Sequence, residues 1–586
     1  MSRTTSGTTS GTTPKATEFS PSTRYWAETH EVENQPPPLE DYNAFTTDAA
    51  LQQQVMAHDG EWALPDLVKL GALTGSSEVI EWGFQANEHK PQLHTHNRHG
   101  ARVDEVRYHP AYHQLMKLAI EEGIHAQHWT ERRPAGHVVR ACKFYLMTQV
   151  EAGHGCPITM TSAAIPALKN QPSLYQQWAP KILMPKYDPR NIPDAQKAGL
   201  TIGMAMTEKQ GGSDVRTNTT RAYPMEEGGA GEAYELVGHK YFVSAPMCDA
   251  FLVLAQTAPG VSCFLVPRWR PDGSKNPLQI QKLKNKMGNV SNASSETELR
   301  GALGWLVGEE GRGVATILEM VAMTRFDCMI GSAAGMRQAV AQSTHHCSQR
   351  VAFGKVLTEQ PLMQNVLADL IIEQEAALAL TMRIGRALDH SDTDEQERLL
   401  VRMGTAVGKY WICKRTPGHA YEAMECIGGM GVMEDGIMPR LYREAPINTI
   451  WEGSGNVQCL DMLRAMHKSP GSLEAFMAEL NGVKGMHPDM DRATDELARE
   501  FARQASLGEA AMEYHARRTV EKMALAIQAS SLLQFGNALV AEAFCRSRFG
   551  HENSGWVYGT LPAGVDCSAI IERATPVMSG PSETVF

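Results

Sequence analysis

The chain has 586 residues, which is too long for one ordinary domain of about 100–200 residues. Its 42% hydrophobic content is typical of a folded globular protein, and its formal net charge of −11 disfavours a dedicated nucleic-acid binder. No apolar run approaches about 18 residues, so no membrane span is predicted.

The N-terminal segment and the cysteines indicate the cellular setting. Residues 1–24 are rich in Ser, Thr and Gly and lack an apolar core, which predicts a disordered tail and not a secretory signal. An organellar transit peptide is the alternative for this Ser/Thr-rich, acid-poor start. The eleven cysteines occur singly, without a C-x-x-C pair, so a reduced, cytoplasmic protein without a cysteine-ligated structural zinc is predicted.

Residues 25–200 show a mainly helical pattern. The segments HPAYHQLMKLAIEEGIHAQHW and GHVVRACKFYLMTQVEAGHGCPITMTSAAIPAL place apolar residues at helical spacing. From residue 201 the pattern changes to short, partly alternating segments rich in β-formers, such as AYELVGHKYFVSA, AFLVLAQT and VSCFLVP. Residues 201–306 are therefore predicted to form a compact antiparallel β domain, with a hairpin connection at the glycine-rich residues 226–231.

The remainder of the chain returns to helical spacing. Long helices are predicted within residues 307–470, where short loops favour an antiparallel bundle. A further helical extension is predicted for residues 471–586, after Pro470 and Gly471. The expected fold class is α+β, in the order helical, β, helical, helical.

The first chemical motif is MTEKQGGSD, residues 206–214, at the start of the β domain. Its two glycines stand beside hydroxyl and amide groups, a composition that can present backbone N–H donors to phosphates or a heterocycle. A tight turn capped by Ser and Asp is the plainer interpretation. The chain contains neither a G-x-x-x-x-G-K-[ST] phosphate loop nor a G-x-G-x-x-G dinucleotide motif after a strand.

The second motif is WEGSGN, residues 451–456, which places Glu452 beside an indole in a glycine-flanked segment. A carboxylate held against an aromatic surface is a candidate proton acceptor with a tuned pKa. Because a helical pattern follows, Glu452 could instead cap a helix N-terminus, and the local residues do not decide between these interpretations.

Other polar residues carry weaker signals. Arg350, before Phe353 and Gly354, could pair with a phosphate, although an ordinary helix-end arginine is the plainer interpretation. His125 and His128 share a helix face, whereas the adjacent His345 and His346 do not. Neither pair has an acidic third ligand at a recognisable spacing, so no metal site is predicted.

Two extended patterns together resemble the acyl-CoA dehydrogenase superfamily. The first is AMTEKQGGSDVRT, residues 205–217, which departs from the family only at Thr217, where a small residue is expected. The second is ECIGGMGVMEDGIMPRLYRE, residues 425–444, which is highly specific over its length. Within the superfamily the chain is similar to flavoproteins associated with the adaptive response to DNA alkylation, through CPITMT at 156–161, MTRFDC at 323–328 and IWEGSGN at 450–456.

The resemblance implies FAD as the cofactor. The positions that match the family's flavin contacts are Met206, Thr207, Gly212, Ser213, Phe242, Val243, Ser244, Trp451, Gly453 and Asn456. Arg350 and Phe353 match the segment that reaches the FAD of a neighbouring subunit, which implies an oligomer, with a homotetramer expected.

The resemblance also assigns Glu452 the role of catalytic base. This carboxylate would take the α-proton of an acyl-CoA thioester while hydride passes from the β-carbon to flavin N5. The alternative base position of the family falls at Thr324, before Arg325, so Glu452 has no rival there. Thr324, Arg325 and Trp451 are expected to line the substrate pocket, with Trp451 narrowing it relative to a smaller aromatic residue.

The alternative function is a DNA-binding flavoprotein that limits alkylation damage with little acyl-CoA turnover. Its C-terminal domain should then be basic, because phosphate neutralisation dominates such binding. Residues 471–586 contain 10 Lys and Arg against 15 Asp and Glu, so 10 − 15 = −5. A local basic face of Arg499, Arg503, Arg517 and Arg518 is nevertheless conceivable, with a solvated helix surface as the plainer interpretation.

Overall fold

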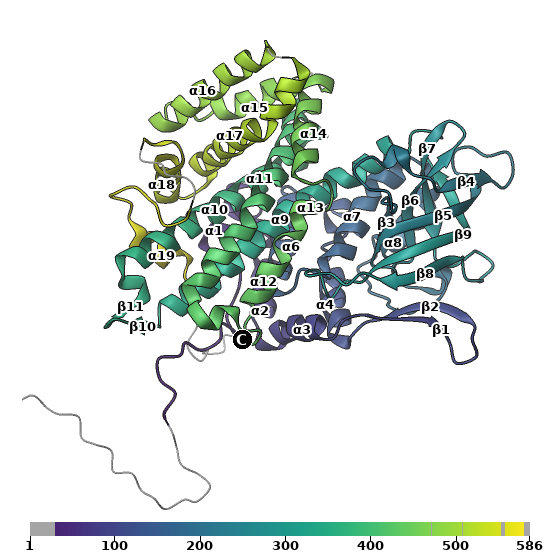
Figure 1. Cartoon of the computed structure of the whole chain (residues 1–586), viewed down its shortest axis with the longest axis horizontal. Helices are drawn as coiled ribbons and strands as arrows, with labels where there is room; N and C mark the ends of the chain where they lie inside the picture. The colour runs from purple at the N-terminus through teal and green to yellow at the C-terminus, as the bar shows by residue number, and fades with distance from the viewer. Residues whose placement is uncertain (1–29, 470, 507, 552–556, 579–586) are drawn as a thin grey trace, which may run out of the picture.

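The computed structural model describes residues 30–469, 471–506, 508–551 and 557–578. The tail predicted for residues 1–24 lies outside these ranges. In Figure 1 the strands of the central domain form a unit on one side, and helices from both halves of the chain form the rest. The predicted α+β class and the order of helical and β regions are confirmed.

The N-terminal region is mainly helical. Asp48 and Ser76 begin two of its helices by accepting hydrogen bonds from backbone N–H groups of the first turn. The helices are α1 (Ala49–Ala57), α2 (Leu64–Thr74), α3 (Ser77–Glu88), α4 (Pro110–Glu121), α5 (Gln127–Thr130), α6 (Gly136–Val150), α7 (Gly155–Lys169) and α8 (Pro172–Ile182).

A β-hairpin interrupts these helices, and the helical prediction for residues 25–200 missed it. Its strands are β1 (Gln92–His96) and β2 (Arg102–Arg107). Both are short and polar, so local propensity indicates little. Contacts with the distant central domain stabilise them: Arg102 Nη2 donates to the Ile280 carbonyl at 2.8 Å, and the Ile280 N–H donates to Asp104 at 3.1 Å.

The central domain is a closed β structure. Its strands are β3 (Ile202–Ala205), β4 (Arg221–Pro224), β5 (Ala233–Ser244), β6 (Ala250–Thr257), β7 (Gly260–Pro267), β8 (Leu278–Leu283) and β9 (Ser294–Val307). Strand β7 pairs with both β9 and β6, which closes the path β6-β4-β5-β9-β7 into a barrel. The strands run from Ile202 to Val307, beside the predicted domain limits of 201–306. Contrary to the prediction, the sheet is not wholly antiparallel, because β3 and β6 pair in parallel.

The C-terminal half is built on three long helices, α9 (Gly313–Cys347), α10 (Pro361–His390) and α11 (Glu395–Ile427). Shorter helices follow: α12 (Met438–Glu444), α13 (Ile447–Ile450) and α14 (Gly455–Lys468). Helices α6 and α7 of the N-terminal region pack against α9, so residues from both ends of the sequence share one apolar core. No helix in the described ranges is long and apolar enough to cross a membrane.

The extension is also helical, as predicted, and most of its described buried apolar residues belong to the core of the bundle. It contains α15 (Ser472–Asn481), α16 (Pro488–Ala505), α17 (Glu509–Phe535), α18 (Ala538–Phe549) and α19 (Cys567–Ala574). Helix α17 packs on α10, α11 and α14, and its apolar residues belong to the same cluster as the bundle core. Figure 1 shows α15 to α17 lying across one end of the bundle.

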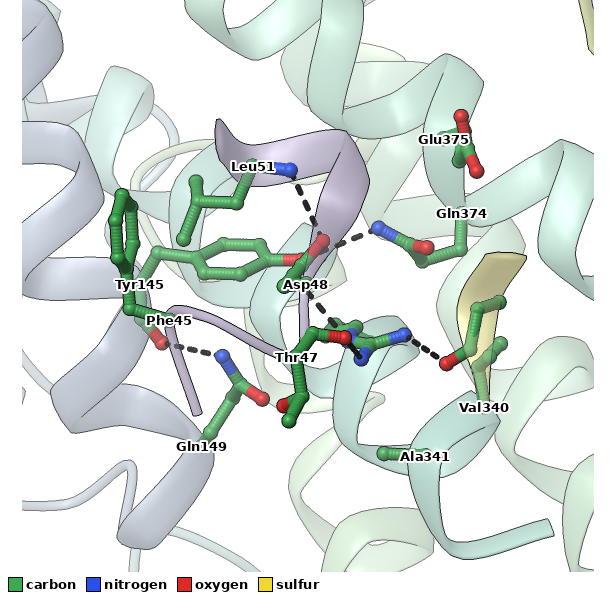
Figure 2. Close-up of polar contacts among 12 residues, drawn as sticks. Phe45, Thr47, Asp48, Leu51, Tyr145, Gln149, Val340, Ala341, Gln374 and Glu375 are labelled. Carbon is green, nitrogen blue, oxygen red and sulfur yellow. Dashed lines mark hydrogen bonds and ion pairs between the residues drawn. The ribbon is translucent and has the colours of Figure 1, made fainter. Parts of the chain in front are cut away.

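A buried polar network ties the first and last described segments to the bundle (Figure 2). Asp48 accepts a hydrogen bond from the Tyr145 hydroxyl at 3.3 Å and pairs with Arg337 Nε at 3.2 Å. Arg337 also donates to the carbonyls of Thr47, at 3.0 Å, and Ala574, at 2.8 Å. The network therefore joins α6 and α9 to Thr47, near the start of the described chain, and to Ala574, near its end. These two residues are more than 500 positions apart in the sequence.

The signature at residues 425–444 also joins domains. Arg440 donates to the carbonyls of Gly83 and Val150 in the N-terminal region. Glu444 accepts the Asn289 N–H of the central domain at 2.7 and 2.8 Å. Burial, together with the nearby Glu151 charge, raises the pKa of Glu444 to about 7. Arg440 and Glu444 therefore connect the helical bundle to the N-terminal region and to the central domain, close to the loop that follows α13.

Candidate active site

The loop of residues 451–454 joins α13 to α14 and carries Glu452 in a left-handed conformation, with φ of 57°. Such a backbone is unfavourable for a residue with a side chain and persists only where its surroundings hold it. Three side chains supply that hold by donating hydrogen bonds to loop carbonyls. They are Lys409, with bonds of 2.9 Å to Trp451 and 2.6 Å to Gly453; Gln458, with 3.0 Å to Glu452 and Gly453; and Arg325, with 2.9 Å to Glu452.

Sequence reasoning did not identify Lys409 or Gln458, and no local motif marks either of them. Lys409 is a fully buried lysine in the middle of α11, 42 residues before the loop. A buried ammonium needs acceptors, and the loop carbonyls satisfy it. Arg325, predicted to line the substrate pocket, donates to the loop backbone at Glu452 and pairs with Asp461 at 2.8 Å.

The Glu452 carboxylate contacts Thr324 of α9, whose hydroxyl donates to Oε2 at 2.6 Å. Burial raises the pKa of Glu452, while the Thr324 hydrogen bond and the charges of Arg325 and Lys409 oppose that rise. The structure contradicts the capping interpretation, since the N-cap of α14 is Ser454 and no side chain caps that helix. The carboxylate is half-buried and points to α9.

Trp451 lies between the bundle and the central domain. Its indole Nε1 donates to Asn448 Oδ1 at 2.8 Å, and Asn448 Nδ2 donates to Ser332 on α9 at 3.1 Å. The ring is half-buried and packs against the core of the central domain and α7. These contacts fix the position of the indole next to Glu452 in the loop.

The glycine-rich loop after β3 is pinned by Glu208. This buried carboxylate pairs with Lys240 at 2.8 Å and accepts the backbone N–H groups of Thr219, at 2.7 Å, and Thr220, at 3.1 Å. Met206 and Thr207 are half-buried, and Gly212 and Ser213 are exposed. A Cβ at Gly212 would stand 2.4 Å from Thr207 Oγ1, so only glycine fits there.

The same loop offers donors to a polar ligand. Among the described residues, the backbone N–H groups of Gly212 and Ser213 have no acceptor. The first N–H groups of α14, at Gly455, Asn456 and Val457, are likewise without an acceptor in the part of the chain that is described. Unpaired N–H groups on two loops are the donor set that an anionic, heterocyclic cofactor such as FAD requires, so the residues present fit it.

Strand β5 contributes an exposed aromatic edge. Phe242 is 44% exposed, Val243 is buried, and the half-buried Ser244 lies 3.0 Å from the Ser294 hydroxyl on the paired strand β9. The ammonium of Lys284 lies 4.7 Å from the Phe242 ring centroid, a cation–π contact. The β5–β9 pairing is irregular between Lys240 and Val243, and the side chain of Phe242 is left exposed within this irregular stretch.

The Arg350 and Phe353 positions lie elsewhere in the chain. They flank and form the hairpin of β10 (Val351–Ala352) and β11 (Lys355–Val356), which Figure 1 places at the end of the bundle away from the central domain. Phe353 is 99% exposed with φ of 51°, and Arg350 donates to the Asn34 carbonyl. Arg350 and Phe353 therefore lie away from the 451–456 loop of the same chain.

One histidine of each pair contacts a backbone carbonyl. His125 contacts the Met184 carbonyl at 3.2 Å, and His345 contacts the Pro37 carbonyl at 2.9 Å. Within the described ranges, no three His, Cys, Asp or Glu side chains are grouped so that they could hold a metal ion.

Comparison with known families covers most of the chain in three consecutive matches. Residues 34–189 match the Adaptive response protein AidB N-terminal domain, residues 203–302 match the Acyl-CoA dehydrogenase, middle domain, and residues 311–467 match the Acyl-CoA dehydrogenase, C-terminal domain. Residues after 467, and with them the extension, lie outside these matches.

Two curated relatives extend the similarity. The putative acyl-CoA dehydrogenase AidB of Escherichia coli is 44% identical over 524 residues, which cover 89% of this chain and 94% of the relative. Acyl-CoA dehydrogenase family member 11 of Caenorhabditis elegans is 31% identical over 436 residues, covering 72% of this chain and 69% of the relative.

Solved structures agree on the fold. Caenorhabditis elegans ACDH-11, solved in complex with C11-CoA, superposes with a TM-score of 0.81 at 24% identity, over 93% of this chain and 97% of that one. An acyl-CoA dehydrogenase from Bacillus anthracis complexed with FAD superposes with a TM-score of 0.60 at 18% identity, over 80% and 87% of the two chains.

Proposed function

This chain belongs to the acyl-CoA dehydrogenase superfamily, and from that membership we propose that it is an FAD-dependent oxidoreductase that introduces a double bond next to the carbonyl of an acyl-CoA thioester. The observation that carries the proposal is Glu452: a half-buried carboxylate with a raised pKa, fixed by Thr324 and beside Trp451. A base for a weakly acidic carbon needs such a raised pKa to accept the proton at working pH.

The proposed reaction removes two hydrogens from neighbouring carbons. FAD, when bound, supplies the acceptor for the hydride that leaves the β-carbon. Glu452 takes the proton from the α-carbon, and the electron pair of that bond becomes the new Cα=Cβ bond. Glu452 then holds the proton on its carboxyl group until product release, so atoms and charge balance.

The backbone at Glu452 has a second proposed role. Its N–H has no acceptor among the described residues, which leaves it available to the thioester oxygen where negative charge develops. Lys409, Gln458 and Arg325 hold the neighbouring carbonyls, so this N–H keeps a fixed direction. The residues that would hold FAD are the loop at 206–213, Phe242, Val243 and Ser244 of β5, and Trp451, Gly453 and Asn456.

Two measurements test the proposal directly. The purified protein should show the visible absorbance of bound flavin. Under anaerobic conditions, at least one thioester from a panel of acyl-CoAs of increasing chain length and branching should bleach that absorbance. A protein that contains no flavin contradicts the cofactor assignment, and a flavin that no thioester reduces contradicts the dehydrogenase assignment.

Replacing Thr324 with valine should shift the pH dependence of flavin reduction to higher pH. The Thr324 hydroxyl stabilises the ionised form of Glu452, so its loss raises the pKa of that carboxyl further. Because only the ionised base accepts a proton, the rate rises with pH through this pKa, and the rising limb moves upward. Stopped-flow reduction across a pH series measures the shift, with Thr324→Ser as the control that keeps the hydroxyl. If the rising limb of the pH–rate profile lies at the same pH in Thr324→Val and in the wild type, the role of Thr324 is disproved.

An oligomer, with a homotetramer expected, is part of the proposal. Phe353 is 99% exposed and lies at the tip of the β10–β11 hairpin, which Arg350 directly precedes. This hairpin is remote from the 451–456 loop of the same chain. Val351 of the same hairpin is also exposed, and two exposed apolar side chains on one hairpin support a contact with a second copy. Light scattering at several protein concentrations measures the assembly, and a monomer at all of them would exclude it.

Duplex DNA is the second candidate ligand, suggested by the match to the adaptive response domain. The structure gives this hypothesis little support, because Arg503, one of the four arginines of the predicted basic face, pairs with Glu500 at 2.7 Å. With the extension at −5, we expect no stable complex with duplex DNA at about 150 mM salt. A gel shift over a salt series measures this, and a complex that weakens steeply with salt would favour the DNA hypothesis.

A further inference from the structure

Two cationic side chains from different helices meet at the first turn of α14. Arg517 of α17 donates from Nε to Asn456 Oδ1 at 2.8 Å. Lys414 of α11 approaches the same turn, since a Cβ at Gly455 would stand 3.3 Å from its Nζ. After burial, the charge of Arg517 is the largest cause that lowers the pKa of Lys414, so the two cations lie close enough to repel.

No carboxylate of the described residues forms an ion pair with either of these two cations. Within the described residues, neither Arg517 nor Lys414 forms an ion pair, and both side chains are exposed. The contrast with the next turns of α14 is informative: there Asp461 pairs with Arg325 at 2.8 Å and with Arg402 at 2.9 Å. In the described part of the chain, one group of cations is therefore ion-paired, whereas Arg517 and Lys414, beside Asn456, are not.

The backbone at the same place has unused donors. The N–H groups of Gly455, Asn456 and Val457 have no acceptor in the described chain, and Ser454 does not cap the helix through its side chain. Arg517 uses only Nε toward Asn456, so both of its η nitrogens stay available. A forked guanidinium, an ammonium and a helix start together form the donor set that binds a diphosphate.

We propose that Arg517 and Lys414, with Asn456 and the first turn of α14, bind the diphosphate of a nucleotide ligand. This inference rests on the proposed function, which offers two carriers of that group, FAD and CoA. FAD is favoured, because Asn456 and Gly453 belong to the loop assigned to it. Arg517 is part of the extension, beyond the three family matches, so the extension would contribute a ligand contact that the matched domains do not contain.

The test compares Arg517→Ala with Arg518→Ala. Arg518 is its exposed neighbour on α17 and forms no ion pair or side-chain hydrogen bond with any described residue, so it is a matched control for loss of one positive charge. Apoprotein is titrated with FAD by flavin fluorescence and, separately, with free CoA by calorimetry. Arg517→Ala should raise the Kd of the diphosphate ligand by about tenfold, whereas Arg518→Ala should leave it near the wild-type value.

Three further readouts separate the outcomes. Wild-type affinity should fall with ionic strength more steeply than that of Arg517→Ala, and Lys414→Met should reproduce part of the loss without touching Asn456. A change confined to FAD or to CoA supports the proposal and identifies the carrier. Unchanged Kd values for both ligands in both variants would overturn it. Wild-type protein that binds no FAD would instead contradict the proposed function, and the CoA arm then decides the present inference alone.

Discussion

Glu452→Gln should retain bound FAD but lose flavin reduction by acyl-CoA, with a rate lower by about 10²–10⁴-fold, the contribution of a positioned general base. Glutamine has the same shape, and its amide oxygen can still accept the Thr324 hydroxyl, which lies 2.6 Å from Oε2 in the wild type. The loop at 451–454 should therefore keep its conformation, because Lys409, Gln458 and Arg325 bind its carbonyls and not the carboxylate. What the variant lacks is a group that can accept the α-proton.

Stopped-flow reduction with the best thioester of the panel measures this loss. Glu434→Gln is a suitable control, because Glu434 is an exposed carboxylate that pairs with Arg443 at 2.5 Å on the surface. The flavin of Glu434→Gln should be reduced at the wild-type rate. If Glu452→Gln also does so, the base is another residue, and the assignment of Glu452 fails even if the flavin is present.

Arg337→Met should lower the stability of the whole protein strongly. Removing one partner of a buried ion pair lowers the free energy of unfolding by about 3–5 kcal/mol, because the other charge remains buried without a partner or water. Asp48 and Arg337 are 1% and 2% exposed, and Arg337 also satisfies the carbonyls of Thr47 and Ala574. Figure 2 shows Leu51, Tyr145 and Gln374 beside Asp48. Because Asp48 and Arg337 are almost fully buried, water has little access to replace the guanidinium.

Calorimetric melting of the flavin-loaded protein measures the effect. Arg398→Met, which removes the exposed pair with Glu395 at 2.9 Å, is the matched control and should change the melting temperature little. The double variant Asp48→Asn, Arg337→Met should recover part of the loss, since it removes the uncompensated charge. A single variant that melts like wild type would show that the Asp48 carboxylate finds another partner or a proton.

A stability loss in Arg337→Met should reach the extension as well as the bundle. Arg337 is on α9, whereas Ala574 ends α19, so one side chain couples the bundle to the last described helix. The apolar core is also shared between the bundle and α17. A single melting transition is therefore expected for these two parts, although residues 307–470 and 471–586 look like separate segments in the sequence.

The sequence by itself determined the family, the order of the regions and the central residue of the candidate site. Helical and alternating patterns are local, so they placed the β domain at 201–306 against strands observed from Ile202 to Val307. Glu452 was identifiable because it lies within a contiguous motif. Its two local interpretations, base or helix cap, were equally balanced until the position of Ser454 in the folded chain excluded the cap.

Only the tertiary structure decided which residues support that site. Lys409 and Arg517 lie 42 and 61 residues from the groups they contact, and no spacing in the sequence marks those distances. Thr324 was expected in the pocket from the resemblance, but its hydrogen bond to Glu452, 128 residues away, is seen only in the folded chain. Contacts between distant parts of the chain also determine three features of the fold. They are the hairpin of β1 and β2, the parallel pairing of β3 with β6, and the core that the extension shares with the bundle. A local pattern reports the period of one segment, whereas hydrogen bonds and buried charges are satisfied by whichever distant groups the packed chain brings within about 3 Å.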